Sequence, residues 1–360
     1  MTTTAAKSDD WVAMQGILSR IAIGPVGSRD LTREQAREAM RLALTGDVSP
    51  VQQGAFLLAA RLKRETTDEN LGFLDALIAS ARVVSAKSPD VVSLADPYNG
   101  FTRTPHFAAP TAAVLAACGV PTYLHGGADV PPKHGLTARQ VFQARGQDVG
   151  IGAGLKSVEA AASKLDEVGV AYVDVEDFCP ALAALNEVRR DIAKRPCLAL
   201  LEKLVTPLRG AEHTHVVTGW VHQGYQDELV ALLRDRGVTS ATLVKGREGH
   251  VDPAVHKDTL VVGYNRLGEP LDLMLRPKSY GLLLSEAPDF GALSAEVVAD
   301  LWDDALHRKR RQLPGQTVRL LAGTVLTQVG KASTVMRGVG MAHEAIVSGR
   351  ARDLLSAFSA

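Results

Sequence analysis

Cysteine is scarce in this chain of 360 residues, which has three cysteines and no CxxC pair. Cys118, Cys179 and Cys197 are odd in number and widely spaced, which excludes a disulfide framework. The chain also lacks a visible secretory signal and an apolar run long enough to span a bilayer. We therefore expect a cytoplasmic protein with reduced, buried cysteines and no membrane partner.

The chain also carries no formal net charge at pH 7. Lysine plus arginine and aspartate plus glutamate each number 40, so bulk charge points to neither a nucleic-acid nor a membrane partner. A local basic patch remains compatible with this balance. The composition, 46% hydrophobic and 22% charged, is that of a globular protein. The length allows two or three domains or one large α/β unit, and no low-complexity segment or fixed-period repeat is visible.

The first 85 residues show the punctuation of helices. Capping boxes, in which Ser or Thr is followed three residues later by Gln or Glu, mark three helix starts: Thr32 with Gln35, Ser49 with Gln52, and Thr66 with Glu69. Apolar residues recur at helical spacing from Ala36 to Ala43, and Gly46 ends that pattern. The sequence therefore predicts a small helical bundle, and residues 179–194 read as one more helix that could return to it.

From about residue 90, short β-branched runs alternate with alanine-rich helical stretches. This alternation predicts a mainly parallel sheet covered by helices. The expected strands are 91–96, 121–126, 170–175, 213–219, 239–246 and 259–264. The fold class is therefore α/β, with an N-terminal helical bundle domain and a larger α/β domain. We place the helical domain at 1–88, joined by the returning helix near 178–196, and the α/β domain at 89–177 and 197–360.

The stretch "DPYNGFTRTPH", residues 96–106, lies between an expected strand and an expected helix, where α/β proteins bind phosphate. Phosphate cradles are usually rich in glycine, and this stretch has one. Asn99, Thr102, Arg103 and Thr104 could still bind an anion, because arginine matches phosphate oxygens. A rigid turn with a solvated Arg103 is the alternative.

Other motifs carry weaker signals. His213 and His215 lie on one face of a strand, with His222 nearby, but no third ligand is suitably spaced for zinc. "VGIGAG" at 149–154 lacks the strand and the spacing of a dinucleotide fingerprint and predicts a loop. Basic runs at 61–64, 188–195, 275–281 and 307–311 are typical of solvated faces. In one of them, Arg276, Lys278 and Tyr280 form the basic and aromatic mixture that can hold nucleic acid.

Several stretches, in order, resemble the anthranilate phosphoribosyltransferase family and, through it, nucleoside phosphorylases of the same fold. The helical stretch from Leu31 to Leu77 resembles the family's N-terminal domain. "TPLRG" resembles its Gly-Pro-Leu-x-Asn-Pro turn, and the resemblance runs from about residue 30 to the end. The family's His-Gly-Asn loop, its later lysine and its arginine helix would correspond to His125, Gly126, Gly127, Lys133, Arg189, Arg190 and Arg195.

The resemblance breaks at two motifs. The family binds phosphoribosyl pyrophosphate through a Gly-Thr-Gly-Gly-Asp loop, and Tyr98, Asn99 and Phe101 stand in that region here. Its adjacent Asp-Glu pair binds magnesium, whereas Asp252 is followed here by Pro253. One carboxylate is a weak magnesium site, so Mg is the only cofactor implied and its support is weak. Glu248 could compensate, and a polar turn is the alternative.

The glycine-rich loop and the Asp-Glu pair, which bind the same ligand in the family, are both altered in this chain. The two changes together predict that the chain binds a different ligand. By resemblance, the pattern is similar to a divergent branch with nucleic-acid-binding members. We expect a polyanion such as single-stranded nucleic acid or a nucleotide to bind, and no transfer of phosphoribose to anthranilate. An active pentosyltransferase with another acceptor, oriented by Arg189, is the alternative. The resemblance implies a homodimer, and the run Phe56-Leu57-Leu58 suggests an exposed apolar face. The expected ligand-binding residues are Asn99, Gly100, Thr102, Arg103, His125, Gly126, Lys133, Arg189 and Arg190.

Overall fold

The computed structural model describes residues 7–24, 26–149, 157–284, 286, 289–307 and 313–358. The chain divides into two compact units. The helical unit comprises Met1–Arg82 and Cys179–Val205, and the α/β unit comprises Val83–Phe178 and Thr206–Ala360. The helical unit's second segment thus runs on to Val205, beyond the returning helix expected near 178–196.

The helical unit is built from amphipathic helices whose starts are set by side-chain caps. Its helices are α1 (Asp9–Ile21), α2 (Arg33–Thr45), α3 (Pro50–Lys63), α4 (Thr67–Ala79), α9 (Pro180–Ala184), α10 (Asn186–Ile192), α11 (Leu198–Leu201) and the 3-10 helix η1 (Glu202–Leu204). All three expected capping boxes are present, at the starts of α2, α3 and α4. Each box satisfies backbone N–H groups that the first helical turn leaves unpaired.

Two expectations for this unit are wrong. The helix expected at 179–194 is two short helices, α9 and α10, because the Leu185 N–H bonds to Leu182 O, three residues back, and tightens the chain there. Phe56 and Leu57 are fully buried, and the Phe56 ring packs edge-on against Phe73 at 5.5 Å. Their run therefore belongs to the core of the helical unit and provides no exposed apolar face.

The α/β unit contains a seven-stranded sheet in the order β4-β3-β2-β6-β7-β8-β9. All six expected strands are present, as β2 (Asp90–Ala95), β3 (Thr122–Gly126), β4 (Val170–Asp174), β6 (His213–Gly219), β7 (Ser240–Val244) and β8 (Thr259–Tyr264). The strands from β4 to β7 pair in parallel, and β8 is antiparallel to β7. The sequence did not predict the edge strand β9 (Pro270–Leu275) or the short parallel pair β1 (Val84–Ser85) and β5 (Leu208–Arg209).

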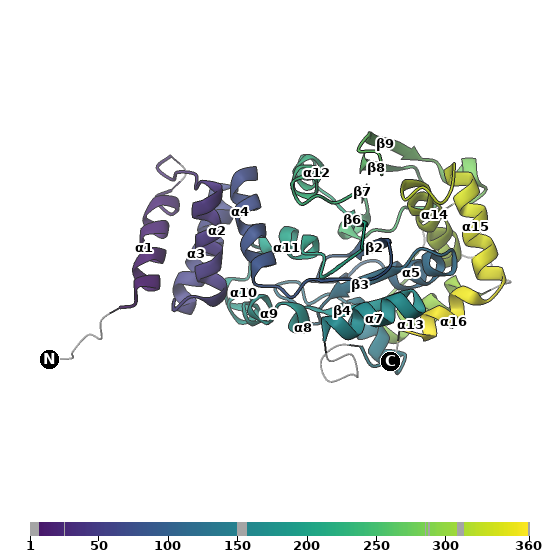
Figure 1. Ribbon diagram of the computed structural model, residues 1–360, viewed down its shortest axis with the longest axis horizontal. Helices are drawn as coiled ribbons and strands as arrows, with labels where there is room; N and C mark the ends of the chain where they lie inside the picture. Colours follow the sequence, from purple (N-terminus) through teal and green to yellow (C-terminus); the bar gives the residue numbers. More distant parts are fainter. Residues whose placement is uncertain are drawn as a thin grey trace. The chain divides into compact units, whose positions relative to one another are not determined.

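Helices cover this sheet and share its core. They are α5 (Ala108–Ala117), α6 (Ala138–Ala144), α7 (Val158–Val168), α8 (Val175–Phe178), α12 (Tyr225–Asp235), α13 (Ala295–Ala305), α14 (Leu313–Gln328), α15 (Val335–Val347) and α16 (Arg350–Ser356), with 3-10 helices η2 (Arg247–Gly249) and η3 (Pro277–Tyr280). Helix α5 is buried along nearly its whole length, as its alanine-rich, all-round apolar sequence predicts. It packs against α14, α15 and α16, as Figure 1 shows.

The parallel strands place five chain segments along one edge of the sheet. Because β2, β3, β4, β6 and β7 run in the same direction, the residues after each strand meet at their carboxyl ends. Ligands of open α/β sheets bind at this edge. Loop 96–104 follows β2, and the segment that leads into η2 follows β7. In the part of the chain that the structure describes, no helix is both long and apolar enough to cross a membrane.

Candidate functional site

Loop 96–104 is held in a fixed shape by the segment that follows β3. The Phe101 N–H donates to Leu136 O at 2.9 Å, and the Leu136 N–H donates back to Phe101 O at 2.8 Å. The Gly135 N–H donates to Asn99 O at 2.9 Å. Gly100 has a φ of +67°, and a Cβ there would collide with the Gly135 carbonyl. Gly100 is therefore required by the turn itself.

The hydrogen-bond donors of this loop converge on the carboxylate of Glu248, in η2. The backbone N–H groups of Thr102 and Arg103 donate to it at 3.2 and 2.8 Å. The hydroxyls of Thr102 and Thr104 donate at 3.2 Å each. Lys133 Nζ lies 2.7 Å from Oε1, and the Glu248 side chain is 1% exposed. The structure thus brings together Thr102, Arg103 and Lys133 from the expected site, around an anion that belongs to the chain.

The charge state of Glu248 follows from these contacts. Burial alone would raise the pKa of its carboxyl group, but the hydrogen bond from Lys133 and those from the Arg103 and Thr102 N–H groups outweigh burial. Together they lower the pKa to about 2. Glu248 is therefore ionised at neutral pH, and its negative charge neutralises the positive charge of Lys133.

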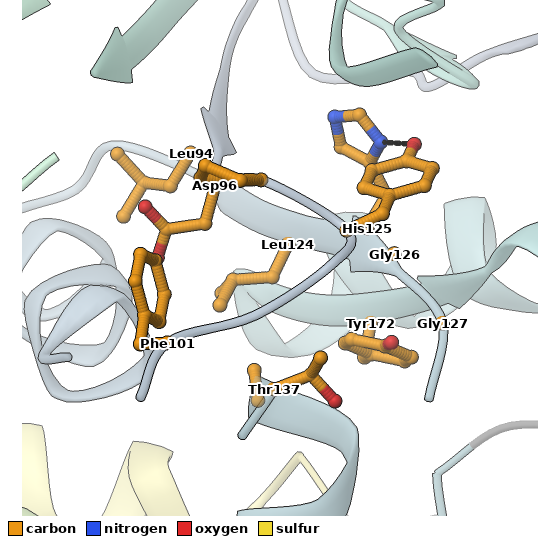
Figure 2. Close-up of a pocket in the computed structure, with 12 residues that line it drawn as sticks. Leu94, Asp96, Phe101, Leu124, His125, Gly126, Gly127, Thr137 and Tyr172 are labelled. Carbon is orange, nitrogen blue, oxygen red and sulfur yellow. Dashed lines mark hydrogen bonds between the residues drawn. The ribbon is translucent and has the colours of Figure 1, made fainter. Parts of the chain in front are cut away.

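His125 and Gly126 line a small pocket next to the same loop. The His125 ring is buried between the Ser93 hydroxyl, 3.0 Å from Nε2, and the Tyr98 hydroxyl at Nδ1. Figure 2 shows His125 with Asp96, Phe101 and Tyr172 around the pocket. Burial lowers the pKa of His125 to about 3, so its ring is neutral at physiological pH. It cannot attract an anion as a cation would.

Asp252 does not fit a magnesium site. Its side chain is buried, and burial together with nearby Asp96 raises its pKa well above the ordinary value, which disfavours the ionised form that would bind a metal. One of its oxygens accepts the Phe107 N–H at 2.8 Å. Glu248, the residue that could have compensated, is held by the loop. Within the described ranges, no group of three or more His, Cys, Asp or Glu residues could hold a metal ion.

Arg189 and Arg190 lie on α10 of the helical unit in different environments. The Arg189 guanidinium is 1% exposed and pairs with the equally buried Glu202, with Nη1 2.7 Å from Oε2 and Nη2 3.3 Å from Oε1. The Arg189 guanidinium, which the resemblance implies would orient the acceptor, is thus bound to Glu202. Arg190 is exposed on the same helix. Asn99, by contrast, is buried in loop 96–104.

The basic run around η3 and the histidines of β6 lie outside loop 96–104. Arg276 and Lys278 are exposed, and Arg276 Nε lies 3.8 Å from the Asp258 carboxylate. Tyr280 is half-buried, which raises its pKa. His215 bonds to Ser240 and Asp90 within the sheet and therefore has protein partners in place of a metal. Residues 308–311 of the last basic run and 150–154 of "VGIGAG" lie outside the described residues.

A cluster of cations that no sequence motif indicated lies beside Glu248. We define the β7 cation cluster as Lys245, Arg247 and Lys257, all of them exposed. Burial lowers the pKa of His256. The positive charges of Lys257 and Arg247, which lie close to its ring, lower that pKa further. Lys245 Nζ lies 5.1 Å from the centre of the Trp220 ring, after β6. Within the described parts of the chain, none of the three forms an ion pair with a carboxylate, whereas Lys133 does.

Comparison with known proteins identifies the family. Residues 15–81 match the helical bundle domain of a glycosyl transferase family, and residues 106–352 match the α/β domain of a glycosyl transferase family. An anthranilate phosphoribosyltransferase of Methylorubrum extorquens is 30% identical over 345 residues, which cover 95% of this chain and 98% of the relative. The chain therefore belongs to the glycosyl transferase family that includes the anthranilate phosphoribosyltransferases.

One further relative agrees with this assignment, and one solved structure shows the same fold. An anthranilate phosphoribosyltransferase of Deinococcus radiodurans is 29% identical over 347 residues, covering 96% of this chain and 98% of the relative. The Saccharomyces cerevisiae enzyme, solved in complex with PRPP and Mg, has the same fold, with a TM-score of 0.76 at 15% identity. That comparison covers 98% of this chain and 97% of the yeast chain. Loop 96–104 lies between the two family matches, outside both.

Proposed function

We propose that this protein binds a polyanion, specifically single-stranded nucleic acid, and does not transfer phosphoribose to anthranilate. The observation that carries the proposal is the position of the Glu248 carboxylate, which takes up the donors of loop 96–104 and Lys133. A pyrophosphate group would meet a buried negative charge at this place. Electrostatic repulsion and the loss of these donors disfavour such a ligand.

The polyanion part of the proposal is supported by the β7 cation cluster. Lys245, Arg247 and Lys257 are exposed at the carboxyl edge of the sheet. Binding of nucleic acid depends on lysine and arginine contacts to phosphates, which need exposed cations that are not already neutralised. The zero net charge of the chain does not oppose this, because the cluster is local.

The proposal is tested by offering both ligands to the wild-type protein. A fluorescently labelled single-stranded DNA oligonucleotide is titrated at two salt concentrations, and phosphoribosyl pyrophosphate is titrated with magnesium by calorimetry. We expect the oligonucleotide to bind with an affinity that falls as salt rises. In a separate complementation experiment, we expect the protein not to restore growth of a strain that lacks anthranilate phosphoribosyltransferase. Magnesium-dependent binding of phosphoribosyl pyrophosphate without DNA binding would instead favour a glycosyltransferase with another acceptor.

We also propose that the protein forms a homodimer. The evidence is a set of exposed apolar side chains on the helical unit, and not the run Phe56-Leu57-Leu58. Val51 and Leu62 on α3 are 80% and 81% exposed, and Val12 on α1 is 56% exposed. Large apolar side chains in such numbers on neighbouring helices favour a protein contact. Light scattering at micromolar concentration is expected to give twice the monomer mass of 38.3 kDa, and a monomer would contradict the proposal.

A further inference from the structure

The contacts of Glu248 have the form of a bound anion in a binding site. Both carboxylate oxygens are used, and the hydrogen-bond donors come from residues 102–104 and 133, more than 100 positions away in the chain. Two backbone N–H groups, two hydroxyls and the Lys133 ammonium group surround the carboxylate, and Arg103 Nε lies 3.7 Å from Oε1. Phosphate groups in proteins are held by the same kinds of donor. We call these donors, from Thr102, Arg103, Thr104 and Lys133, the loop cradle.

The backbone of Glu248 indicates that the cradle, and not local preference, holds this residue. Its φ is +59°, in the left-handed region that glycine adopts readily and glutamate does not. A non-glycine residue persists there where its surroundings compensate for the strain. Here the compensation comes from the charged hydrogen bonds of the side chain.

The loop cradle does not depend on Glu248 for its shape. Hydrogen bonds between Phe101 and Leu136, and from Gly135 to Asn99, fix the loop from the opposite side. Lys133 Nζ also donates to the Gly100 carbonyl oxygen, which positions the ammonium group. The donors would therefore stay in place if the carboxylate were removed.

We propose that the loop cradle is a complete binding site for a phosphate or pyrophosphate anion that the chain masks with its own Glu248 side chain. This inference deepens the proposed function, since it gives a reason for the proposed rejection of pyrophosphate at this edge of the sheet, where the exposed cations beside the cradle stay available. It concerns the loop donors alone and does not require that nucleic acid binds.

The test removes the carboxylate and measures the affinity for inorganic pyrophosphate by calorimetry at low salt. In Glu248→Gly the side chain is gone and the strained φ is relieved, so we expect pyrophosphate to bind at least tenfold more tightly than to the wild type. Glu248→Ala should show the same gain, and serves if the glycine variant does not fold. Adding Lys133→Ala to either variant should abolish the gain, because the principal cation of the cradle is lost.

The control is Glu269→Gly, which removes an exposed glutamate from the turn before β9 and changes the net charge by the same amount. We expect its affinity for pyrophosphate to equal that of the wild type. Folded Glu248 variants that bind pyrophosphate no better than the wild type would overturn the inference. So would an equal gain in the control, since it would reflect net charge alone. Neither result changes the binding of single-stranded DNA by the wild-type protein, which tests the proposed function separately.

Discussion

Replacing Arg189 with alanine is expected to lower the free energy of unfolding by about 3–5 kcal/mol. The substitution leaves the Glu202 carboxylate buried without its partner, and both side chains of the pair are 1% exposed. Burial already raises the pKa of Glu202, and Arg189 opposes that rise. Without the guanidinium, Glu202 must either take up a proton or remain ionised in an apolar environment. Urea denaturation of the two proteins at pH 7 measures the difference.

The neighbouring Arg190→Ala is the matched control, because the same residue type is exposed on the same helix. We expect it to change stability by less than about 0.5 kcal/mol. Arg189→Met combined with Glu202→Leu should recover most of the lost stability, since it removes both charges at once. An Arg189→Ala protein that is as stable as the wild type but binds its ligand less well would restore the ligand-contacting role that the family resemblance implies.

Local signals explain why much of the fold could be predicted from the sequence. The capping boxes at Thr32, Ser49 and Thr66 depend on residues three positions apart, so they can be read directly. The parallel strands are short runs rich in β-branched residues, and most of their residues are buried. The edge strand β9 was missed because it begins with a proline and alternates exposed with half-buried residues, as strands do at the edge of a sheet.

The candidate site could be predicted only in part, because its central contact is not local. The sequence indicated loop 96–104 and Lys133, but it offered Glu248, more than 100 residues away, only as a possible magnesium ligand and not as their partner. The stretch "KGREGH" was interpreted as the place of a metal pair, so its two exposed cations were overlooked. Arg189 was assigned by resemblance, and its burial depends on Glu202, which carries no motif of its own.

Neutralising two of the three residues of the β7 cation cluster is expected to weaken the binding of single-stranded DNA roughly a hundredfold at low salt. Lys245→Ala with Arg247→Ala removes two contacts to phosphate, each worth about 1.5 kcal/mol when the hydrogen bond is charge-assisted. Each lost phosphate contact also reduces the salt dependence. The slope of log K against log salt should therefore decrease in magnitude by about 1.4, since each contact to a single strand contributes about 0.7.

A second double variant, Arg276→Ala with Lys278→Ala, separates this site from the one that the sequence suggested. It removes the same number of positive charges from the same unit, at η3. Arg276 already lies near the Asp258 carboxylate, so less of its charge is available to a phosphate. We expect this variant to keep an affinity within about threefold of the wild type. If it instead loses the larger share of binding while the β7 variant keeps it, the nucleic acid contacts η3, and the β7 cluster has no part in recognition.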